Sequence, residues 1–282
     1  MAADRFHFWG IDGCRGGWVA CGISRHRHRK REKPQEILQC LSSDLSSLLA
    51  SILGGGGRTI LIDIPIGLPD RNNPQRQCDV EARRILGRGG ASSVFSPPCR
   101  EALYEASYAE ACDVNGRVLG RRISIQTWNI CPRIREADQW MRNRSRESCL
   151  TIHESHPEVC FTRLAGADRR LASKKSEAGH LHRLCVLREN GLDPDLIGFP
   201  QYSGDGQSMV HPAQDDILDA LVLALTASFD DRLEYLPDGD SQSSLSGIHP
   251  VEDSHGLPMK IAMPPVGFRT REIKSPEPTN PH

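Results

Sequence analysis

Short apolar runs separated by glycine-rich or polar breaks dominate the first part of the chain. Residues 8–24 form two such runs around the break Gly13-Cys14-Arg15-Gly16-Gly17, and a third lies near residues 36–40, so the pattern predicts a three-stranded antiparallel meander. Asp44 precedes the run LSSLLASIL, which predicts a capped amphipathic helix ended by the glycines at 54–57. Nearly continuous Ile and Leu at 59–68 are typical of a strand buried on both faces.

The rest of the chain alternates between helical and strand-like patterns. Residues 70–146 are polar and arginine-rich, with helical patches broken by Pro and Gly, and predict a helical insertion. A strand is expected within 149–161, and helices within 176–190 and 213–229. We therefore expect one domain over residues 1–230. Residues 231–282 form a largely irregular tail with a possible edge strand at 259–265.

Charge and cysteine usage narrow the class of protein. The formal net charge of -1 gives no global attraction to nucleic acid or to an anionic membrane, so a polyanion would need a local basic surface. The ten cysteines form no CxxC pair, which indicates reduced thiols and a cytoplasmic location. The first residues do not resemble a signal peptide, and no apolar run approaches the ~18 residues of a membrane span, so we expect no membrane association.

Acidic residues occur in three separated apolar segments. Asp12 interrupts the first strand, Asp63 interrupts the run at 59–68, and Asp215, Asp216 and Asp219 open the apolar helix. Asp12 and the helix acids have ordinary interpretations, as a turn residue and as acids favourable to the helix dipole, whereas an exposed position is not expected for Asp63 in so apolar a run. A buried carboxylate needs a partner, however, and clustered carboxylates repel unless a cation neutralises them. Oxygen ligands suit Mg²⁺ or Mn²⁺, ions that activate water in phosphodiester hydrolysis.

Five ordered motifs resemble an uncharacterised family of predicted RNase H-like nucleases. They are GIDGCRGGWV, LIDIPIGLP, SSVFSPPCREAL, ESHPEVCF and DDILDALVLALTA, and the resemblance covers roughly residues 8–230. It implies an α/β RNase H-like fold: a mixed five-stranded sheet of order 3-2-1-4-5 with helices on both sides and a helical insertion after strand 4. In that fold the first strand, the fourth strand and a late helix each bring an acid to a shared metal site.

By position, the resemblance assigns catalytic roles to Asp12, Asp63, Asp216 and Asp219, and metal binding to Asp12, Asp63 and Asp219. The DxxDA spacing of the late helix also looks like that of Holliday-junction resolvases. Which of the helix acids contacts metal stays open, with Asp219 and Asp216 ranked above Asp215.

The ESHPEV and SSVFSPPCR motifs supply further candidates. Glu154 is a possible fourth catalytic acid and His156 a possible proton shuttle, although Pro157 suggests a strand end where polar groups only satisfy the backbone. Ser93 and Arg100 would contact phosphate from a stiff proline-containing lip, or belong to a helix-capping loop.

Three other residues are candidates for substrate binding. Gln126 and Trp128 could recognise a base by hydrogen bonding and stacking, or Trp128 could belong to the core. Lys174, within SKK, could guide a phosphate backbone. A set of arginines could do the same, or could form only a solvated face: Arg117, Arg121, Arg122, Arg133, Arg135, Arg142, Arg144 and Arg146.

The sequence thus predicts a divalent-metal-dependent nuclease or phosphodiesterase, a hydrolase with Mg²⁺ or Mn²⁺ as cofactor and nucleic acid as partner. One alternative is a nucleotide-binding phosphotransferase of the actin-like or sugar-kinase type, against which the sequence lacks a second glycine-rich phosphate loop late in the chain. Another is a non-catalytic interaction module. DNA or RNA, endo or exo cleavage, and formation of a homodimer stay open.

Overall fold

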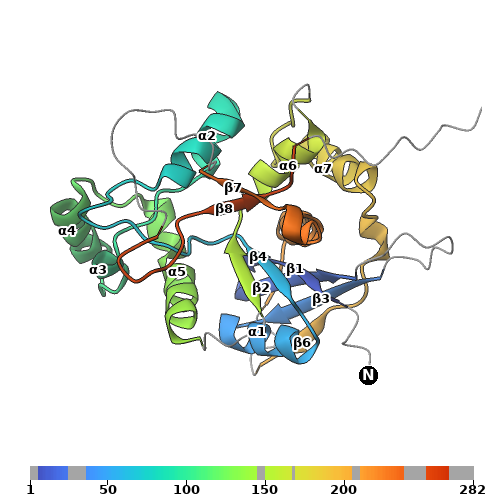
Figure 1. Ribbon diagram of the computed structural model, residues 1–282, viewed down its shortest axis with the longest axis horizontal. Helices are drawn as coiled ribbons and strands as arrows, with labels where there is room; N and C mark the ends of the chain where they lie inside the picture. Colours follow the sequence, from blue (N-terminus) through green and yellow to red (C-terminus); the bar gives the residue numbers. More distant parts are fainter. Residues whose placement is uncertain are drawn as a thin grey trace, which may run out of the picture.

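A mixed six-stranded sheet organises the protein. The computed structural model describes residues 6–24, 36–144, 150–166, 169–204, 210–237 and 252–266 (Figure 1). The strands of the sheet are β1 (Phe8–Cys14), β2 (Gly17–Ile23), β3 (Ile37–Ser42), β4 (Thr59–Ile62), β5 (Thr151–Glu154) and β6 (Gln201–Ser203). Their order is β5-β4-β1-β2-β3-β6, antiparallel across β1, β2 and β3 and parallel elsewhere. The predicted RNase H-like order 3-2-1-4-5 is confirmed, with β6 added at the free edge of β3.

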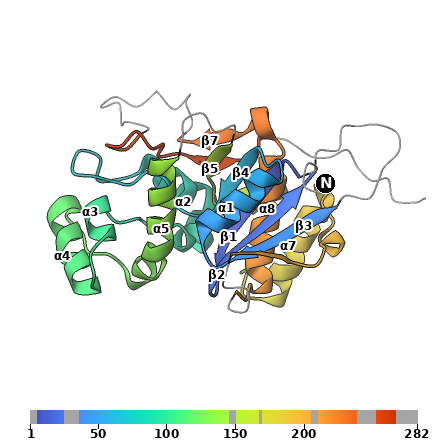
Figure 2. The same ribbon diagram turned by 90° about the horizontal axis from the view of Figure 1, so that it is seen from below.

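Helices cover both faces of this sheet. They are α1 (Leu45–Gly54), α2 (Gln77–Gly90), α3 (Arg100–Leu103), α4 (Tyr108–Leu119), α5 (Ile125–Asn143), α6 (Pro157–Ala165), α7 (Glu177–Glu189) and α8 (Gln214–Ala227). Successive side chains of β1 point to opposite faces of the sheet. Phe8 packs in the core with α6, α7 and α8, whereas Trp9 and Ile11 pack in the core with α1 and α5. Figure 2 shows α1 and α8 on opposite sides of the strands.

Gly10 allows α8 to lie directly against β1. A Cβ atom at this position would be 2.1 Å from the carbonyl oxygen of Ala220 and 2.4 Å from the backbone nitrogen of Ala224. Only glycine fits so close a backbone approach. The small residue two positions before Asp12 therefore fixes how near α8 comes to the end of β1.

The helical insertion after β4 is confirmed. It comprises α2 to α5, of which α3 and α4 lie farthest from the sheet (Figures 1 and 2). The outer part has a small core of its own, formed by Cys99, Ala102, Ala111, Cys112, Leu119 and Ile123. Helix α5 returns to the sheet and packs beside α1, which brings the insertion next to the strand ends.

Two sequence expectations differ from the structure. The strand expected over 59–68 ends at Ile62, because the chain turns away before Pro65, and Asp63 lies just beyond the strand instead of in its middle. The described parts of the expected tail are also packed: β7 (Glu234–Leu236) pairs with β8 (Ile261–Met263), and Met259 contacts a core that includes residues of α2 and α6. Strand β8 falls inside the range 259–265.

The described chain contains nine cysteines, all of them free thiols. Within the same residues, every helix is too short or too polar to traverse a lipid bilayer.

Candidate functional site

Asp12 and Asp63 lie side by side at the carboxyl ends of two parallel strands. Ile11 of β1 is in register with Ile62 of β4, and the Asp63 backbone nitrogen donates to the Ile11 carbonyl oxygen at 3.0 Å. The alternation that places Phe8 toward α8 also directs Asp12 to that face. Register and alternation thus bring two acids that are distant in sequence to one point.

Helix α8 supplies the other acids. Asp219 is 3% exposed, and its Oδ2 accepts a hydrogen bond from Lys174 Nζ at 3.2 Å. Its Oδ1 is buried and has no hydrogen-bond partner among the described residues. Asp216, one turn earlier, is half-buried and accepts a hydrogen bond from the Ala213 backbone nitrogen at 2.8 Å, so it also stabilises the start of the helix.

Burial and neighbouring acids raise the pKa of the four aspartates. Burial, followed by the charges of Asp63, Asp219 and Asp216, raises the pKa of Asp12 well above its ordinary value. Burial also raises the pKa of Asp63, and it raises that of Asp219 to about 7 against the attraction of Lys174. Carboxylates with raised pKa values in one place indicate that the site lacks positive charge for its acids.

Two basic side chains face this cluster. Burial alone would lower the pKa of Lys174, but the carboxylates of Asp219, Asp63 and Asp12 raise it above the ordinary range. Arg133 of α5 donates to the carbonyl oxygen of Cys14, and its charge partly offsets the burial that raises the pKa of Asp216. Lys174 was predicted as a substrate-binding residue, and Arg133 belonged to the predicted basic set.

A cavity of about 140 Å³ opens at the strand ends. Asp12 and Asp63 line it together with Ser93, Phe95, Arg133 and His156. His156 Nε2 lies 3.3 Å from the Ser93 carbonyl oxygen, which can only accept, so Nε2 carries the hydrogen. The buried His156 Nδ1 has no partner among the described residues and is therefore available as a proton acceptor.

Glu158 also belongs near the cluster, although the sequence analysis did not choose it. Its charge raises the pKa of Asp63 and of Asp219. Arg183 of α7 holds it through two hydrogen bonds of 2.7 Å, one to each carboxylate oxygen. The available signal was the second acid of ESHPEV, in the first turn of α6 beyond the strand.

Glu154 is not grouped with the aspartates. It is in register with Ile62, whose side chain packs on the α1 and α5 face of the sheet. Its Oε2 accepts a hydrogen bond from the Ile66 backbone nitrogen at 2.9 Å and another from Arg76. Burial raises the pKa of Glu154 to about 7. Glu154 therefore borders the cavity but is engaged by Arg76.

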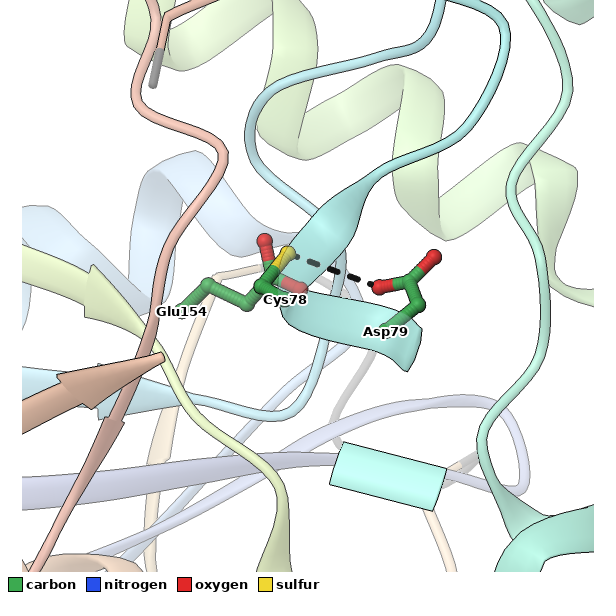
Figure 3. A group of neighbouring side chains, drawn as sticks. All are labelled: Cys78, Asp79 and Glu154. Carbon is green, nitrogen blue, oxygen red and sulfur yellow. Dashed lines mark hydrogen bonds between the residues drawn. The ribbon is translucent and has the colours of Figure 1, made fainter. Parts of the chain in front are cut away.

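Cys78, Asp79 and Glu154 form the one described group whose potential ligand atoms all lie within 4.8 Å of one another, a geometry that could hold a metal ion (Figure 3). The potential ligand atoms of Asp12, Asp63, Asp216 and Asp219 are spread more widely than this. Arg76 already supplies a positive charge to the group, because it bonds to Glu154 and to Asp79 at 3.0 Å. Burial raises the pKa of the Cys78 thiol well above its usual value, and the thiol donates to Asp79 at 3.6 Å. A neutral thiol is a poor metal ligand.

The other predicted substrate-binding residues occupy different places. Ser93 lines the aspartate cavity, and its Oγ donates to the Gly90 carbonyl oxygen at 2.7 Å. Arg100 lies elsewhere, bonded to Asp138 at 2.8 Å and to Asp253 at 2.5 Å. Trp128 is partly buried between two cores, with its ring 6.0 Å from that of Tyr108.

Gln126 and two of the predicted arginines line a second cleft, within the insertion. Gln126 is exposed in this cleft, at the start of α5. Arg121 and Arg122 lie in the connection between α4 and α5. Arg146 lies outside the described residues.

Comparison with known proteins gives one match. The profile of a family described as "Protein of unknown function (DUF429)" matches residues 10–242, which include most of β1, the other strands of the six-stranded sheet, the insertion and α8. No curated protein and no solved structure matches the chain.

Proposed function

The chain belongs to the DUF429 family, and we propose that it is a divalent-metal-dependent phosphodiesterase that hydrolyses nucleic acid. The observation that carries this proposal is the convergence of Asp12, Asp63 and Asp219 from three distant segments. Burial raises the pKa of all three acids, and neighbouring carboxylates raise it further.

The side chains suit a hard divalent cation. Their ligand atoms are carboxylate oxygens, which Mg²⁺ and Mn²⁺ prefer. Asp219 Oδ1 is buried without a hydrogen-bond partner in the described chain, and such an atom is costly unless something binds it. Lys174 already supplies a positive charge at Asp219 Oδ2. Asp12, Asp63 and Asp219 would hold the ion, and Asp216 would lie beside it.

When bound, such an ion supplies water activation and neutralisation of the charge on phosphorus-bound oxygens. The chain's own residues add a base and positive charge. His156 Nδ1 would take a proton next to Asp63, since Nε2 is already a donor to Ser93. Arg133, which lines the cavity, and Lys174, which is bonded to Asp219, would orient the phosphate.

Calorimetric titration with Mn²⁺ and Mg²⁺ tests the site, with cleavage of labelled single-stranded DNA, RNA and a branched DNA junction measured on the same preparations. We expect Asp63→Asn to abolish both metal binding and cleavage, because it removes an ionic ligand without changing the side chain's size. Asp231→Asn makes the same chemical change at an exposed position outside the cavity and should leave both unchanged. Metal binding by Asp63→Asn at the wild-type affinity would refute the assignment.

Cys78→Ser separates this site from the group around Cys78. If Mn²⁺ were held by Cys78, Asp79 and Glu154, loss of the sulfur ligand would weaken its binding. We expect Mn²⁺ affinity and cleavage to be unchanged in Cys78→Ser. A loss of both in Cys78→Ser, with none in Asp63→Asn, would move the site to α2.

A further inference from the structure

The helical insertion contains a second cleft that adjoins the aspartate cavity. This insertion cleft has a volume of about 630 Å³, within the roughly 300–1,000 Å³ typical of ligand pockets. Val94 and Phe95 line both cavities, so one loop separates the acids from the cleft. Arg83, Arg121 and Arg122 also line it.

The arginine charges in this cleft are poorly compensated. Arg83 donates to the Val94 carbonyl oxygen at 2.9 Å and to Ser96 Oγ at 2.8 Å, and Arg121 donates to the Pro74 carbonyl oxygen at 2.9 Å. All three acceptors are neutral. The lining contains no acidic residue. Burial, and then the like charge of Arg83, lower the pKa of Arg121 although Asp79 acts in the opposite direction.

The other lining groups suit the remaining parts of a nucleotide. Phe95 is 39% exposed at the junction of the two cavities, where a base could stack on its ring. Gln126 offers an amide donor and acceptor, and it lies in the first turn of α5, whose amino end favours negative charge. Arg122 is tied only to exposed Asp113, a surface pair of little strength.

We infer that the insertion cleft binds a nucleotide unit next to the phosphate that is cleaved. Its phosphate contacts Arg83 and Arg121, and its base stacks on Phe95. Such a ligand supplies the anion that two neighbouring, partly buried guanidinium groups need. The placement relative to cleavage rests on the proposed function, whereas the binding itself does not.

Fluorescence anisotropy in EDTA tests this inference without cleavage. The probes are short fluorescein-labelled single-stranded DNA and RNA, competed with unlabelled AMP. We expect Arg121→Gln to weaken strand binding about tenfold and to reduce the slope of log affinity against log salt by about 0.7, the value for one lost single-strand phosphate contact. Phe95→Ala should weaken binding about tenfold with little change in the salt slope.

Arg117→Gln is the matched control. Arg117 is an exposed arginine on α4, close in sequence to Arg121 but outside the cleft lining. Equal losses in Arg117→Gln and Arg121→Gln would show binding to a diffuse basic surface and would overturn the inference. So would strand binding that Arg121→Gln and Phe95→Ala leave unchanged. Circular dichroism and thermal unfolding confirm that each variant is folded.

The competition and cleavage arms separate the remaining outcomes. If AMP displaces the labelled strand from the wild type, and does so less well from Arg121→Gln, the cleft binds nucleotides and a free nucleotide is sufficient for binding. If AMP does not displace the strand, the same residues bind a longer ligand. Binding that depends on Arg121, together with no cleavage in Mn²⁺, retains the cleft and refutes the nuclease. Absence of binding by every probe overturns the cleft, even where Asp63-dependent cleavage is observed.

Discussion

Replacing Asp219 by Asn should stabilise the metal-free protein at neutral and alkaline pH. Asn keeps the size of the side chain but removes its charge. Asp219 is 3% exposed and lies close to Asp12 and Asp63. A site built to hold a cation stores repulsion among its acids when it is tested in EDTA. The variant that cannot hold the cation is therefore expected to unfold at a higher temperature.

The magnitude follows from the pKa of Asp219. Its ordinary value is 3.8 and its value in the fold is about 7, a difference of about 3 pH units. At about 1.36 kcal/mol for each unit, the ionised side chain lowers the free energy of unfolding by about 4 kcal/mol. A change of this size corresponds to about 10 °C in the unfolding temperature of a chain of this length.

The pH dependence has a definite sign. Because its pKa is raised, Asp219 binds its proton more tightly in the folded state than in the unfolded state. Wild-type stability therefore falls as the pH rises from about 4 to about 7, whereas Asp219→Asn lacks this loss. Thermal unfolding in EDTA between about pH 4 and pH 8 should show the two proteins converging at the acid end and separating at the alkaline end.

Two outcomes would refute this reasoning. Asp219→Asn could be less stable than the wild type by the same amount at every pH, which would show that the Lys174 contact matters more than the repulsion. It could also behave like Asp231→Asn, in which an exposed acid is changed, and the cluster would then store no electrostatic strain.

Three further predictions concern the support of the site. Gly10→Ala should cost more than about 3 kcal/mol of stability, measured by urea unfolding, and should weaken Mn²⁺ binding, because its Cβ would lie 2.1 Å from the Ala220 carbonyl oxygen. Lys174→Met should tighten Mn²⁺ binding about tenfold in calorimetry, because it removes a positive charge that competes at Asp219. Asp253→Asn should cost about 1–3 kcal/mol and expose residues 252–266 to limited proteolysis, because the carboxylate pairs with Arg100 and accepts backbone hydrogen bonds.

Two of these variants have a matched control, and each of the three has a contrary outcome. Gly54→Ala adds the same methyl group where nothing lies within 4 Å, and an equal loss there would deny the close approach of α8. Lys175→Met removes an exposed charge beside Lys174, and weaker metal binding in Lys174→Met alone would make this lysine a support of the ion instead of a competitor. Hydrogen bonding holds the pKa of Asp253 below its usual value despite burial, so its contribution should disappear as the pH falls. An Asp253→Asn effect that is independent of pH would contradict this.

The main strands and the helix carrying Asp219 were readable from the sequence because their hydrophobic periods are strong. The apolar runs before Asp63 and before Asp12 predict strands, and the order of the strands followed from the resemblance of the five motifs. The convergence of the aspartates then follows, since neighbouring parallel strands end at the same edge of a sheet. Their register, with Ile11 opposite Ile62, is what makes them neighbours.

Glu154 shows where this reasoning stops. A strand exposes alternate residues on opposite faces, so the role of an acid near a strand end depends on a register that a sequence does not specify to one residue. The sequence placed Glu154 near the site but could not show that it lies in register with Ile62 and pairs with Arg76. The packing of the tail was missed for a related reason: Met259 and Asp253 are isolated in a polar segment, and only their distant partners reveal their role.

The two cavities carry uncompensated charges of opposite sign, and the loop that contains Val94 and Phe95 separates them. On one side, Asp12 and its neighbours are short of positive charge, as their raised pKa values indicate. On the other, Arg83 and Arg121 donate only to neutral oxygens. A ligand bound together with cations would place positive charge in the first cavity and a phosphate in the second, and would compensate the charges of both. A protein that kept these residues only for structure would gain stability by pairing the acids with the arginines. The separation of unlike charges across one short loop is therefore the feature that favours a phosphodiester substrate over a purely structural role.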